Sequence, residues 1–318
     1  MYSIGIDLGG TNIAAGIVDE NYNLIKKASI PTGADRDATA IVDDMARLVN
    51  TLIADASLTP DDIISAGIAS PGSVNPERGT VEYANNLPFK AFPICSMLSE
   101  RTGIKKVCID NDANAAALGE AVAGAAKGTK DSVMITLGTG VGGGIIIDGK
   151  IYSGFNYAGA ELGHIVIVYD GVPCSCGRKG CWEAYSSATA LVRMTKEKME
   201  ANKDSKMWEI CSGDINRASG KTSFNAAREG DKSAIELVDE YISYLACGIC
   251  NILNIFQPEI ISIGGGISNE KSNLIDPLVA KVREQEYGAK SGVDRPFTQI
   301  KIAELRNDAG IIGAAALR

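Results

Sequence analysis

Two glycine-rich hairpins of the same design recur along the chain. The first, YSIGIDLGGTNIAAGIVD, reads as a strand, a glycine turn and a second strand, and SVMITLGTGVGGGIIID repeats this plan. A shift of 129 positions aligns Ile6 with Ile135, Leu8 with Leu137, Gly9 with Gly138, Ile17 with Ile146 and Asp19 with Asp148. Because strands alternate with helices along the rest of the chain, the repeat predicts two similarly built α/β domains.

Apolar periodicity predicts further elements between and after the hairpins. Helices are expected over about 37–56, 93–102, 187–200 and 231–255, and strands over about 65–70 and 105–109. The stretch 260–268 is expected to be a buried strand that runs into three glycines. After the strand that ends near 109, an alanine-rich helix is expected, capped by Asp112 or a neighbour. The last residues, NDAGIIGAAALR, read as a helix, whereas 201–222 has no readable pattern.

Composition excludes several classes of protein. The 318 residues favour two domains, and 31 basic against 39 acidic residues give a net charge of −8, which argues against nucleic-acid and membrane partners. The N-terminus has no signal-peptide pattern, and no apolar run reaches the ~18 residues of a membrane span. A cytoplasmic protein is therefore expected, in which the eight cysteines are thiols or metal ligands.

The stretch VPCSCGRKGCWE at 172–183 packs three cysteines into a short loop. A disulfide between Cys174 and Cys176 would be strained, a C-x-x-C redox pair is absent from the loop, and the acidic chain disfavours a nucleic-acid zinc finger. Together with the single histidine, the loop offers a Cys₃His ligand set, which predicts a structural zinc site made of His164, Cys174, Cys176 and Cys181. The alternative is four unrelated residues in a loop.

Three glycine turns each follow a predicted strand, at 7–12, 136–144 and 263–268. Backbone N–H groups without a neighbouring Cβ can approach phosphate oxygens, so the three turns favour a nucleotide site, although tight hairpins also use glycine. The pattern is neither that of a Rossmann dinucleotide site nor that of a Walker A loop.

Three side chains in these turns could bind phosphate or the Mg²⁺ that accompanies it. The carboxylate of Asp7 can hold Mg²⁺ through water, and the hydroxyls of Thr11 and Thr139 can donate to phosphate. Asp112, at a strand end and a helix start, is the candidate general base for a substrate hydroxyl. The spacing alone leaves a simple helix cap equally open for Asp112.

Six motifs in order resemble the ROK family of bacterial sugar kinases, and within it the glucokinases. They are DLGGTN, DNDAN, LGTGVGGG, AELGHI, CSCGRKGCWE and FQPEIISIGGGIS. The resemblance implies a two-domain actin-like ATPase fold, of the ribonuclease H-like and hexokinase type, with a cleft between the domains. It implies a small domain of residues 1–112 with 304–318, which the C-terminal helix rejoins, and a large domain of 113–303 that carries the zinc loop.

The resemblance also implies a reaction and its residues. ATP would phosphorylate the 6-hydroxyl of a hexose, glucose in the first place, with Asp112 as general base, Mg²⁺ on the phosphates and a structural Zn²⁺. The implied sugar contacts are Asn86, Asn111, Asp112, Glu161, His164 and Glu183. The implied nucleotide contacts are Asp7, Gly9, Gly10, Thr11, Asn12, Gly138, Thr139, Gly140, Gly265 and Gly266. A homodimer or homotetramer is implied as well.

One departure from the family pattern bears on the substrate. Many relatives read Asn-Leu-Pro-Gly-Trp in the sugar loop, whereas this chain reads NLPFK at 86–90. A kinase of N-acetylmannosamine, N-acetylglucosamine, mannose, allose or fructose is therefore the alternative. A sugar-responsive regulator is disfavoured because the chain opens directly on the first phosphate-loop strand, and an ATPase without a sugar is disfavoured by Glu161, His164 and Glu183.

Overall fold

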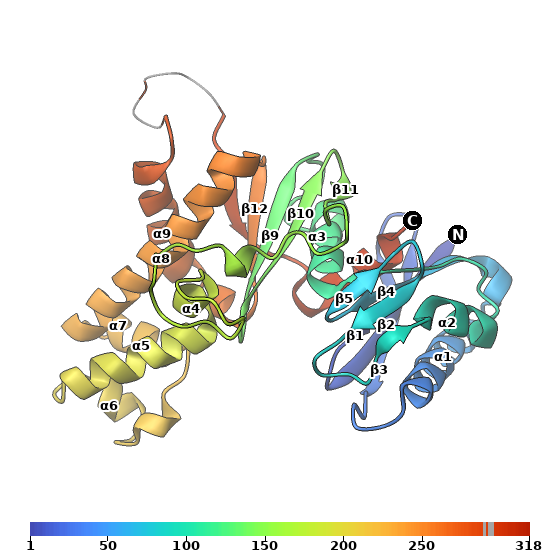
Figure 1. The fold of residues 1–318 in the computed structure, drawn as a ribbon, viewed down its shortest axis with the longest axis horizontal. Coiled ribbons are helices and arrows are strands. Elements are labelled where there is room, and N and C mark those ends of the chain that lie inside the picture. The colour runs from blue at the N-terminus through green and yellow to red at the C-terminus, as the bar shows by residue number, and fades with distance from the viewer. Residues whose placement is uncertain (289–290, 292–295) are drawn as a thin grey trace. The chain divides into compact units, whose positions relative to one another are not determined.

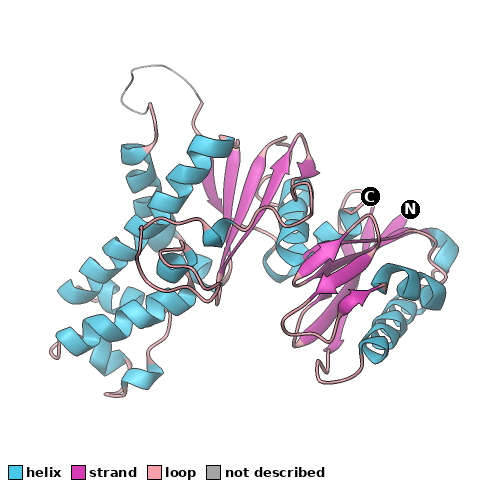
Figure 2. Ribbon diagram, viewed as in Figure 1, coloured by secondary structure: helices cyan, strands magenta, loops and turns pink. Residues whose placement is uncertain are grey.

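Strand β1 (Tyr2–Leu8) alternates between two different surfaces, and this alternation sets the layers around it. Ile4, Ile6 and Leu8 are fully buried in one core, whereas Gly5 and Asp7 point to the opposite face. A computed structural model describes residues 1–288, 291 and 296–318 (Figure 1). It contains both helices and sheets (Figure 2), so the predicted α/β class is confirmed.

The chain divides into two compact units. The first consists of Met1–Met134, Gly144–Ala160 and Ala303–Arg318, and the second of Ile135–Gly143 and Glu161–Ile302. The limits expected from the sequence, 1–112 with 304–318 and 113–303, differ from these units mainly because 113–134 and 144–160 cluster with the first one. The functional domain limits stay a prediction.

The first unit is built on a five-stranded sheet with the order β3-β2-β1-β4-β8. Strands β1, β2 and β3 are antiparallel neighbours, and β4 and β8 continue the sheet in parallel. Its strands besides β1 are β2 (Asn12–Asp19), β3 (Leu24–Pro31), β4 (Ile63–Ser70) and β8 (Val107–Asn111). Its helices are α1 (Ala38–Asp55), α2 (Ile94–Thr102), α3 (Asp112–Ala123) and α10 (Ala309–Ala316).

Helices cover both faces of this sheet. Helix α1 supplies Ile41 and Met45 to the core that holds Ile4, Ile6 and Leu8, while α10 packs against the other face. Backbone meets backbone there: a Cβ on Gly5 would lie 1.8 Å from the carbonyl oxygen of Ile311, and one on Gly67 would lie 1.8 Å from that of Ala314. Only glycine allows this distance, so the glycines of β1 and β4 define how close α10 lies to the sheet.

Helix α10 packs equally closely on α3. A Cβ on Gly313 would lie 1.6 Å from the carbonyl oxygen of Ala115, and one on Gly119 would lie 2.4 Å from that of Ala309. The buried carboxylate of Glu120 strengthens the junction, since it accepts from the N–H groups of Glu304 at 3.1 Å and Leu305 at 2.8 Å. The predicted C-terminal helix is thus confirmed, and it forms part of the first unit.

A small sheet between β4 and α2 was not predicted. Strands β5 (Ser73–Asn75), β6 (Thr80–Tyr83) and β7 (Lys90–Phe92) pair antiparallel in a stretch for which the sequence predicted no strand. These strands are only three or four residues long, so period-two alternation has little room to show itself.

The second five-stranded sheet has the order β11-β10-β9-β12-β13. Its strands are β9 (Ser132–Leu137), β10 (Val141–Ile147), β11 (Lys150–Ile151), β12 (Ile260–Gly264) and β13 (Gln299–Ile302). The β9-β10 hairpin has the same place in this order as β1-β2 in the first sheet, which is the repeat read from the sequence. Strands β9 and β10 each contribute residues to both units.

Helices of the second unit follow the cysteine loop at 172–183. They are α4 (Glu183–Ser186), α5 (Ala188–Ala201), α6 (Met207–Ile210), α7 (Thr222–Arg228), α8 (Lys232–Phe256) and α9 (Ser272–Gln285). Segment 201–222, unreadable from the sequence, contains the short α6 and the 3₁₀ turn Ile215–Arg217. Among the described residues, no helix has both the length and the apolar character that a bilayer crossing requires.

Candidate functional site

The turn from β8 into α3 presents the predicted base. Asn111 is the N-cap of α3: its side chain accepts from the N–H groups of Ala113 at 2.9 Å and Asn114 at 3.3 Å. Asp112 is the first residue of the helix and is exposed, so its carboxylate lies at the positive end of the helix dipole. Oδ1 of Asp112 also accepts from the N–H of Ala113, at 2.9 Å, so Asn111 and Asp112 both hold the start of α3.

Asp110 fixes this turn from beneath. It is buried, and its Oδ1 accepts from the N–H of Asn111 at 2.7 Å and from Nδ2 of Asn114 at 2.9 Å. Burial raises the pKa of Asp110, and the two hydrogen bonds act against that rise. Sequence reasoning had not assigned a role to Asp110 or Asn114, although both belong to the DNDAN motif.

Asp7 lies close enough to Asp112 for the two charges to interact. Burial raises the pKa of Asp7 to about 6, and the negative charge of Asp112 adds to the rise. Glycine at position 310 makes room for this carboxylate, because a Cβ there would lie 2.7 Å from Oδ2 of Asp7. A pair of carboxylates in such surroundings favours a bound cation or proton.

The first glycine turn connects β1 to β2. The N–H of Gly9 donates to the carbonyl of Asn12 at 2.9 Å, and the hydroxyl of Thr32 donates to the carbonyl of Gly9 at 2.7 Å. Gly10, Thr11 and Asn12 are exposed. The turn is therefore braced from behind while its tip stays accessible, as a phosphate-binding turn requires.

Asn86 lies against this turn, since a Cβ on Gly10 would be 3.5 Å from Cβ of Asn86. Leu87 and Phe89 are buried, and the rings of Phe89 and Phe92 lie 5.1 Å apart. The departure from the family pattern at Phe89 thus places an aromatic ring in the core of the first unit, where it anchors the loop that carries Asn86.

The second glycine turn, at 138–140, is held by the first residues of α5. The N–H of Ala188 donates to the carbonyl of Gly138 at 2.8 Å, and the hydroxyl of Thr189 donates to the carbonyl of Thr139 at 2.8 Å. Gly138 and Gly140 close the turn with a hydrogen bond of 3.0 Å.

The third glycine turn lies beside the second. Gly265 has φ +82°, and a Cβ on it would lie 2.4 Å from the carbonyl oxygen of Leu137, the residue before Gly138. Glycine is needed at 265 both for this left-handed conformation and for the close approach. The structure thus brings together two of the three turns predicted to bind nucleotide.

The four predicted metal ligands converge in the second unit. Their ligand atoms all lie within 4.8 Å of one another. Sγ of Cys174 is 3.7 Å from Nδ1 of His164, and Sγ of Cys176 is 3.6 Å from Sγ of Cys181. Tetrahedral coordination at a Zn–S distance of about 2.3 Å separates ligand atoms by roughly 3.8 Å, so the donor set and its spacing fit zinc.

Backbone geometry shapes this loop for its ligands. Gly177 and Gly180 have φ +86° and +78°, and the N–H of Cys174 donates to the carbonyl of Arg178 at 2.8 Å. Burial raises the pKa of Cys181 to about 12, whereas a backbone hydrogen bond from Arg178 lowers the pKa of Cys176. The sequence could predict the loop because all its features are local.

Glu183 begins α4, directly after the loop. Its Oε2 accepts from the N–H of Val141 at 3.0 Å, and its Oε1 accepts from the hydroxyl of Ser175 at 3.3 Å. A Cβ on Gly140 would lie 2.2 Å from Oε2. The structure therefore brings Glu183 to the second glycine turn, a contact across 42 positions that no local pattern announces.

Glu161 directly precedes a 3₁₀ turn, Leu162–His164, of which His164 is the last residue. The N–H of His164 donates to the carbonyl of Glu161 at 3.0 Å, and the side chain of Glu161 is exposed. Gly163 between them lies against Val141, because a Cβ there would be 2.2 Å from the carbonyl oxygen of Val141. This close approach fixes the turn beside the strand that follows the second glycine turn.

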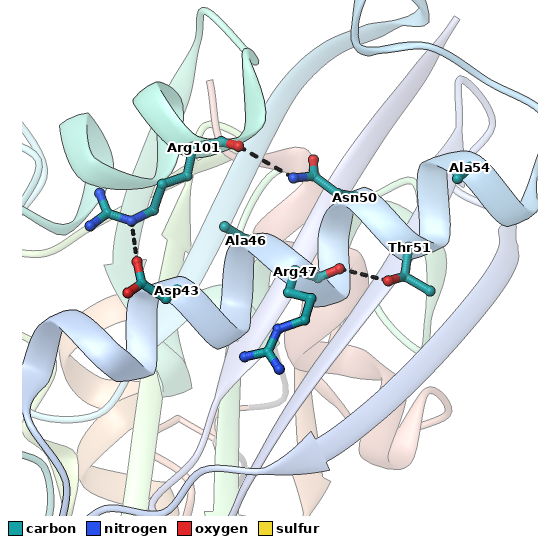
Figure 3. Close-up of a pocket in the computed structure, with 7 residues that line it drawn as sticks. All are labelled: Asp43, Ala46, Arg47, Asn50, Thr51, Ala54 and Arg101. Atoms are coloured by element: carbon teal, nitrogen blue, oxygen red, sulfur yellow. Dashed lines mark hydrogen bonds and ion pairs between the residues drawn. The ribbon is translucent and has the colours of Figure 1, made fainter.

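A groove elsewhere on the first unit contains none of the predicted site residues. It has a volume of about 510 Å³ between α1 and α2 and is lined by Asp43, Ala46, Arg47, Asn50, Thr51, Ala54 and Arg101 (Figure 3). Nε of Arg101 donates to Asp43, and Nδ2 of Asn50 donates to the carbonyl of Arg101 at 3.3 Å. The charges of the groove are satisfied by their own neighbours, so we assign it no role in the chemistry.

Known proteins are similar to this chain along nearly its whole length. The model of the ROK family matches residues 3–318. Glucokinase of Streptomyces coelicolor is 38% identical over 317 residues, which cover 99% of this chain and 96% of that protein. Glucokinase of Thermotoga maritima is 37% identical over 315 residues, covering 99% and 96%.

A solved structure agrees with the sequence relatives. The ROK family glucokinase from Streptomyces griseus, determined in complex with glucose and AMPPNP, superposes with a TM-score of 0.79 at 36% identity. The match covers 99% of this chain and 98% of that one.

The burial of Asp7 predicts a pH-dependent cost to stability. With its pKa raised from 3.8 to about 6, the folded state binds more protons than the unfolded state in this window, so stability falls as pH rises from about 4 to 6. Asp7→Asn should remove this cost, which is up to about 3 kcal/mol. Urea unfolding without added Mg²⁺ should find the variant more stable than wild type at pH 7.5 and the difference much smaller at pH 4.5.

A control of opposite sign is available in Asp19. Hydrogen bonds from the side chain and backbone of Asn23 lower its pKa, so Asp19→Asn should reduce stability at pH 7.5. Equal unfolding free energies for wild type and Asp7→Asn at both pH values would contradict the account of Asp7.

Proposed function

The chain belongs to the ROK family, and on this premise we propose that it transfers the γ-phosphoryl group of ATP to the 6-hydroxyl of a hexose, with glucose as the first choice. The observation that carries the proposal is the match along 99% of the chain to a ROK glucokinase that holds glucose and AMPPNP. The fold is accordingly the two-domain actin-like fold of the hexokinase type.

Asp112 is the proposed general base. Its place in the first turn of α3 favours the ionised form through the helix dipole, and exposure leaves the carboxylate accessible to a hydroxyl. Asn111 and Asp110 hold the turn, so the carboxylate needs little reorganisation before it accepts the proton. Positioning of this kind, with charge stabilisation, is most of what phosphoryl transfer asks of a protein.

The proposed hexose contacts are the side chains of Asn86, Asn111, Glu161, His164 and Glu183. Buried sugar hydroxyls require partners, and charged acceptors form the stronger hydrogen bonds. A site that pairs each hydroxyl rejects an epimer that leaves one of its polar groups unpaired. Phe89 stands where many relatives have glycine, and its ring packs in the core beneath the loop that carries Asn86. This packing sets the position of the Asn86 side chain, on which the preferred hexose depends.

The proposed nucleotide contacts are the three glycine turns. Gly9, Gly10, Thr11 and Asn12 form the first, Gly138, Thr139 and Gly140 the second, and Gly265 and Gly266 the third. This proposal is supported by the hydrogen bonds that hold the carbonyl groups of these turns to neighbouring backbone and side chains. N–H groups and hydroxyls of the turns can then bind phosphate oxygens.

Asp7 suits Mg²⁺, because a partly buried carboxylate beside a second negative charge gains from a hard cation. When bound, Mg²⁺ would neutralise phosphate charge. Asp7 would hold the ion through water, and Thr11 would orient a phosphate oxygen.

Zinc would be held by His164, Cys174, Cys176 and Cys181. Its contribution is structural: it would fix the histidine tautomer, leave Nε2 of His164 for a sugar hydroxyl and set the start of α4, from which Glu183 projects. Since Nδ1 faces Cys174, the remaining nitrogen is the one that is free to meet substrate.

ADP release over a panel of hexoses tests the proposal. Glucose should give the highest kcat/KM, and the panel should include mannose, fructose, allose, N-acetylglucosamine and N-acetylmannosamine. A higher kcat/KM for another member would reassign the substrate. Hexose binding without turnover on any member would favour a sugar-responsive regulator and refute the kinase.

Asp112→Asn isolates the proton-accepting step. The amide keeps the shape and loses the basicity, so kcat should fall by roughly 10²–10⁴-fold while glucose affinity changes little. Coupled kinetics and calorimetric titration of glucose measure the two effects separately. Asp204→Asn, at an exposed carboxylate after α5, is the control with unchanged kcat. Near-normal kcat in Asp112→Asn would remove Asp112 from the role of base.

Elemental analysis tests the metal. Protein purified without chelator should contain about one zinc per chain, as expected for a Cys₃His site. Cys176→Ala should lose the metal, lower Tm and weaken glucose binding together. Cys247→Ala, in α8 and outside the ligand set, should keep the zinc. Wild-type protein free of zinc would refute the site.

A further inference from the structure

Both carboxylate oxygens of Glu183 have protein donors. Oε2 accepts from the backbone N–H of Val141 at 3.0 Å. Oε1 accepts from the hydroxyl of Ser175 at 3.3 Å and lies 3.8 Å from Sγ of Cys174. The carboxylate is thus oriented before any substrate arrives.

These donors come from two segments with different proposed tasks. Val141 directly follows the glycine turn at 138–140, whereas Ser175 stands between two zinc ligands, Cys174 and Cys176. Gly140 is so close to Glu183 that a Cβ would lie 2.2 Å from Oε2. A displacement of the carboxylate therefore acts directly on the turn.

Metal binding changes which donor matters. A cysteine that binds zinc does so as a thiolate and has no proton to donate. With zinc in place, Cys174 ceases to be a donor to Oε1, and the hydroxyl of Ser175 is the side-chain donor to that oxygen recorded among the described residues. Ser175 is not a metal ligand, so its hydroxyl is available for this task.

We propose that Ser175 is a positioning residue for Glu183, and that Glu183, held between Ser175 and Val141, couples hexose binding to the glycine turn at 138–140. The inference rests on the proposed function, because it takes Glu183 as a hexose contact and the turn as a phosphate contact. A hexose on Glu183 and phosphate on the turn then each favour the same arrangement, so each raises the affinity for the other by the same factor.

Calorimetry on zinc-loaded protein measures this coupling. The dissociation constants of glucose and of a non-hydrolysable ATP analogue are determined separately and each in the presence of the other ligand. Ser175→Ala should weaken glucose binding about two- to tenfold, as expected for the loss of one hydrogen bond to a carboxylate. The mutual enhancement, which is the factor by which each ligand raises the affinity for the other, should fall close to one. Ser175→Thr, which keeps the hydroxyl, should restore both.

A double-mutant cycle shows whether Ser175 acts through Glu183. In a Glu183→Gln background, Ser175→Ala should have no further effect on glucose affinity. Zinc content and Tm of Ser175→Ala should equal those of wild type, which separates positioning from damage to the loop. Ser96→Ala, where an exposed hydroxyl on α2 donates to the carbonyl of Pro93, is the matched control.

The outcomes are distinct. If the wild-type protein binds glucose, and Ser175→Ala changes neither the glucose affinity nor the mutual enhancement between glucose and the ATP analogue, this inference is overturned and the proposed function stands. Equal effects of Ser175→Ala in the wild-type and Glu183→Gln backgrounds also overturn it. Failure of the wild-type protein to bind any hexose of the panel overturns the proposed function and this inference with it.

Discussion

The approach of α10 to its neighbours at backbone distance is the constraint on which the first unit depends. Gly5 of β1, Gly67 of β4 and Gly313 of α10 remove the side chains that would otherwise separate sheet, helix α10 and helix α3. Addition of even one methyl group at such contacts requires the backbone to shift. The same close packing places Gly310 beside Asp7, so the carboxylate of Asp7 has room there only because Gly310 has no Cβ.

The second unit is organised around a different principle, in which loops are positioned by polar contacts to a short helix. Glu183 at the start of α4 reaches both the cysteine loop and the second glycine turn, and the start of α5 holds that turn by Ala188 and Thr189. Trp182, fully buried against Gly248, fixes the start of α4 to α8. Such contacts hold the functional side chains of the loops in fixed positions.

Features encoded by neighbouring residues could be predicted from the sequence, whereas contacts made only by tertiary folding could not. The hairpin repeat, helices α1, α5 and α8, and the cluster of three cysteines are each encoded in local patterns, and the structure has them where they were expected. Helix α9 was not predicted. The small sheet β5-β6-β7 was missed because its strands are too short for alternation to be visible. The cap of α3 is Asn111, a choice between adjacent polar residues that spacing cannot decide. The contact of Glu183 with Val141 depends on tertiary folding, so no window of the sequence contains it.

The return of α10 to the first unit has a consequence for how the protein is made. The chain is synthesised from its N-terminus, so β1, β4 and α3 leave the ribosome long before the helix that covers them. Until residues 303–318 emerge, the glycine face of β1 and β4 is an open apolar surface, and the whole of the second unit is produced in the meantime. Nascent first units therefore remain unfinished throughout most of translation, and the last helix serves as the closing step of their folding.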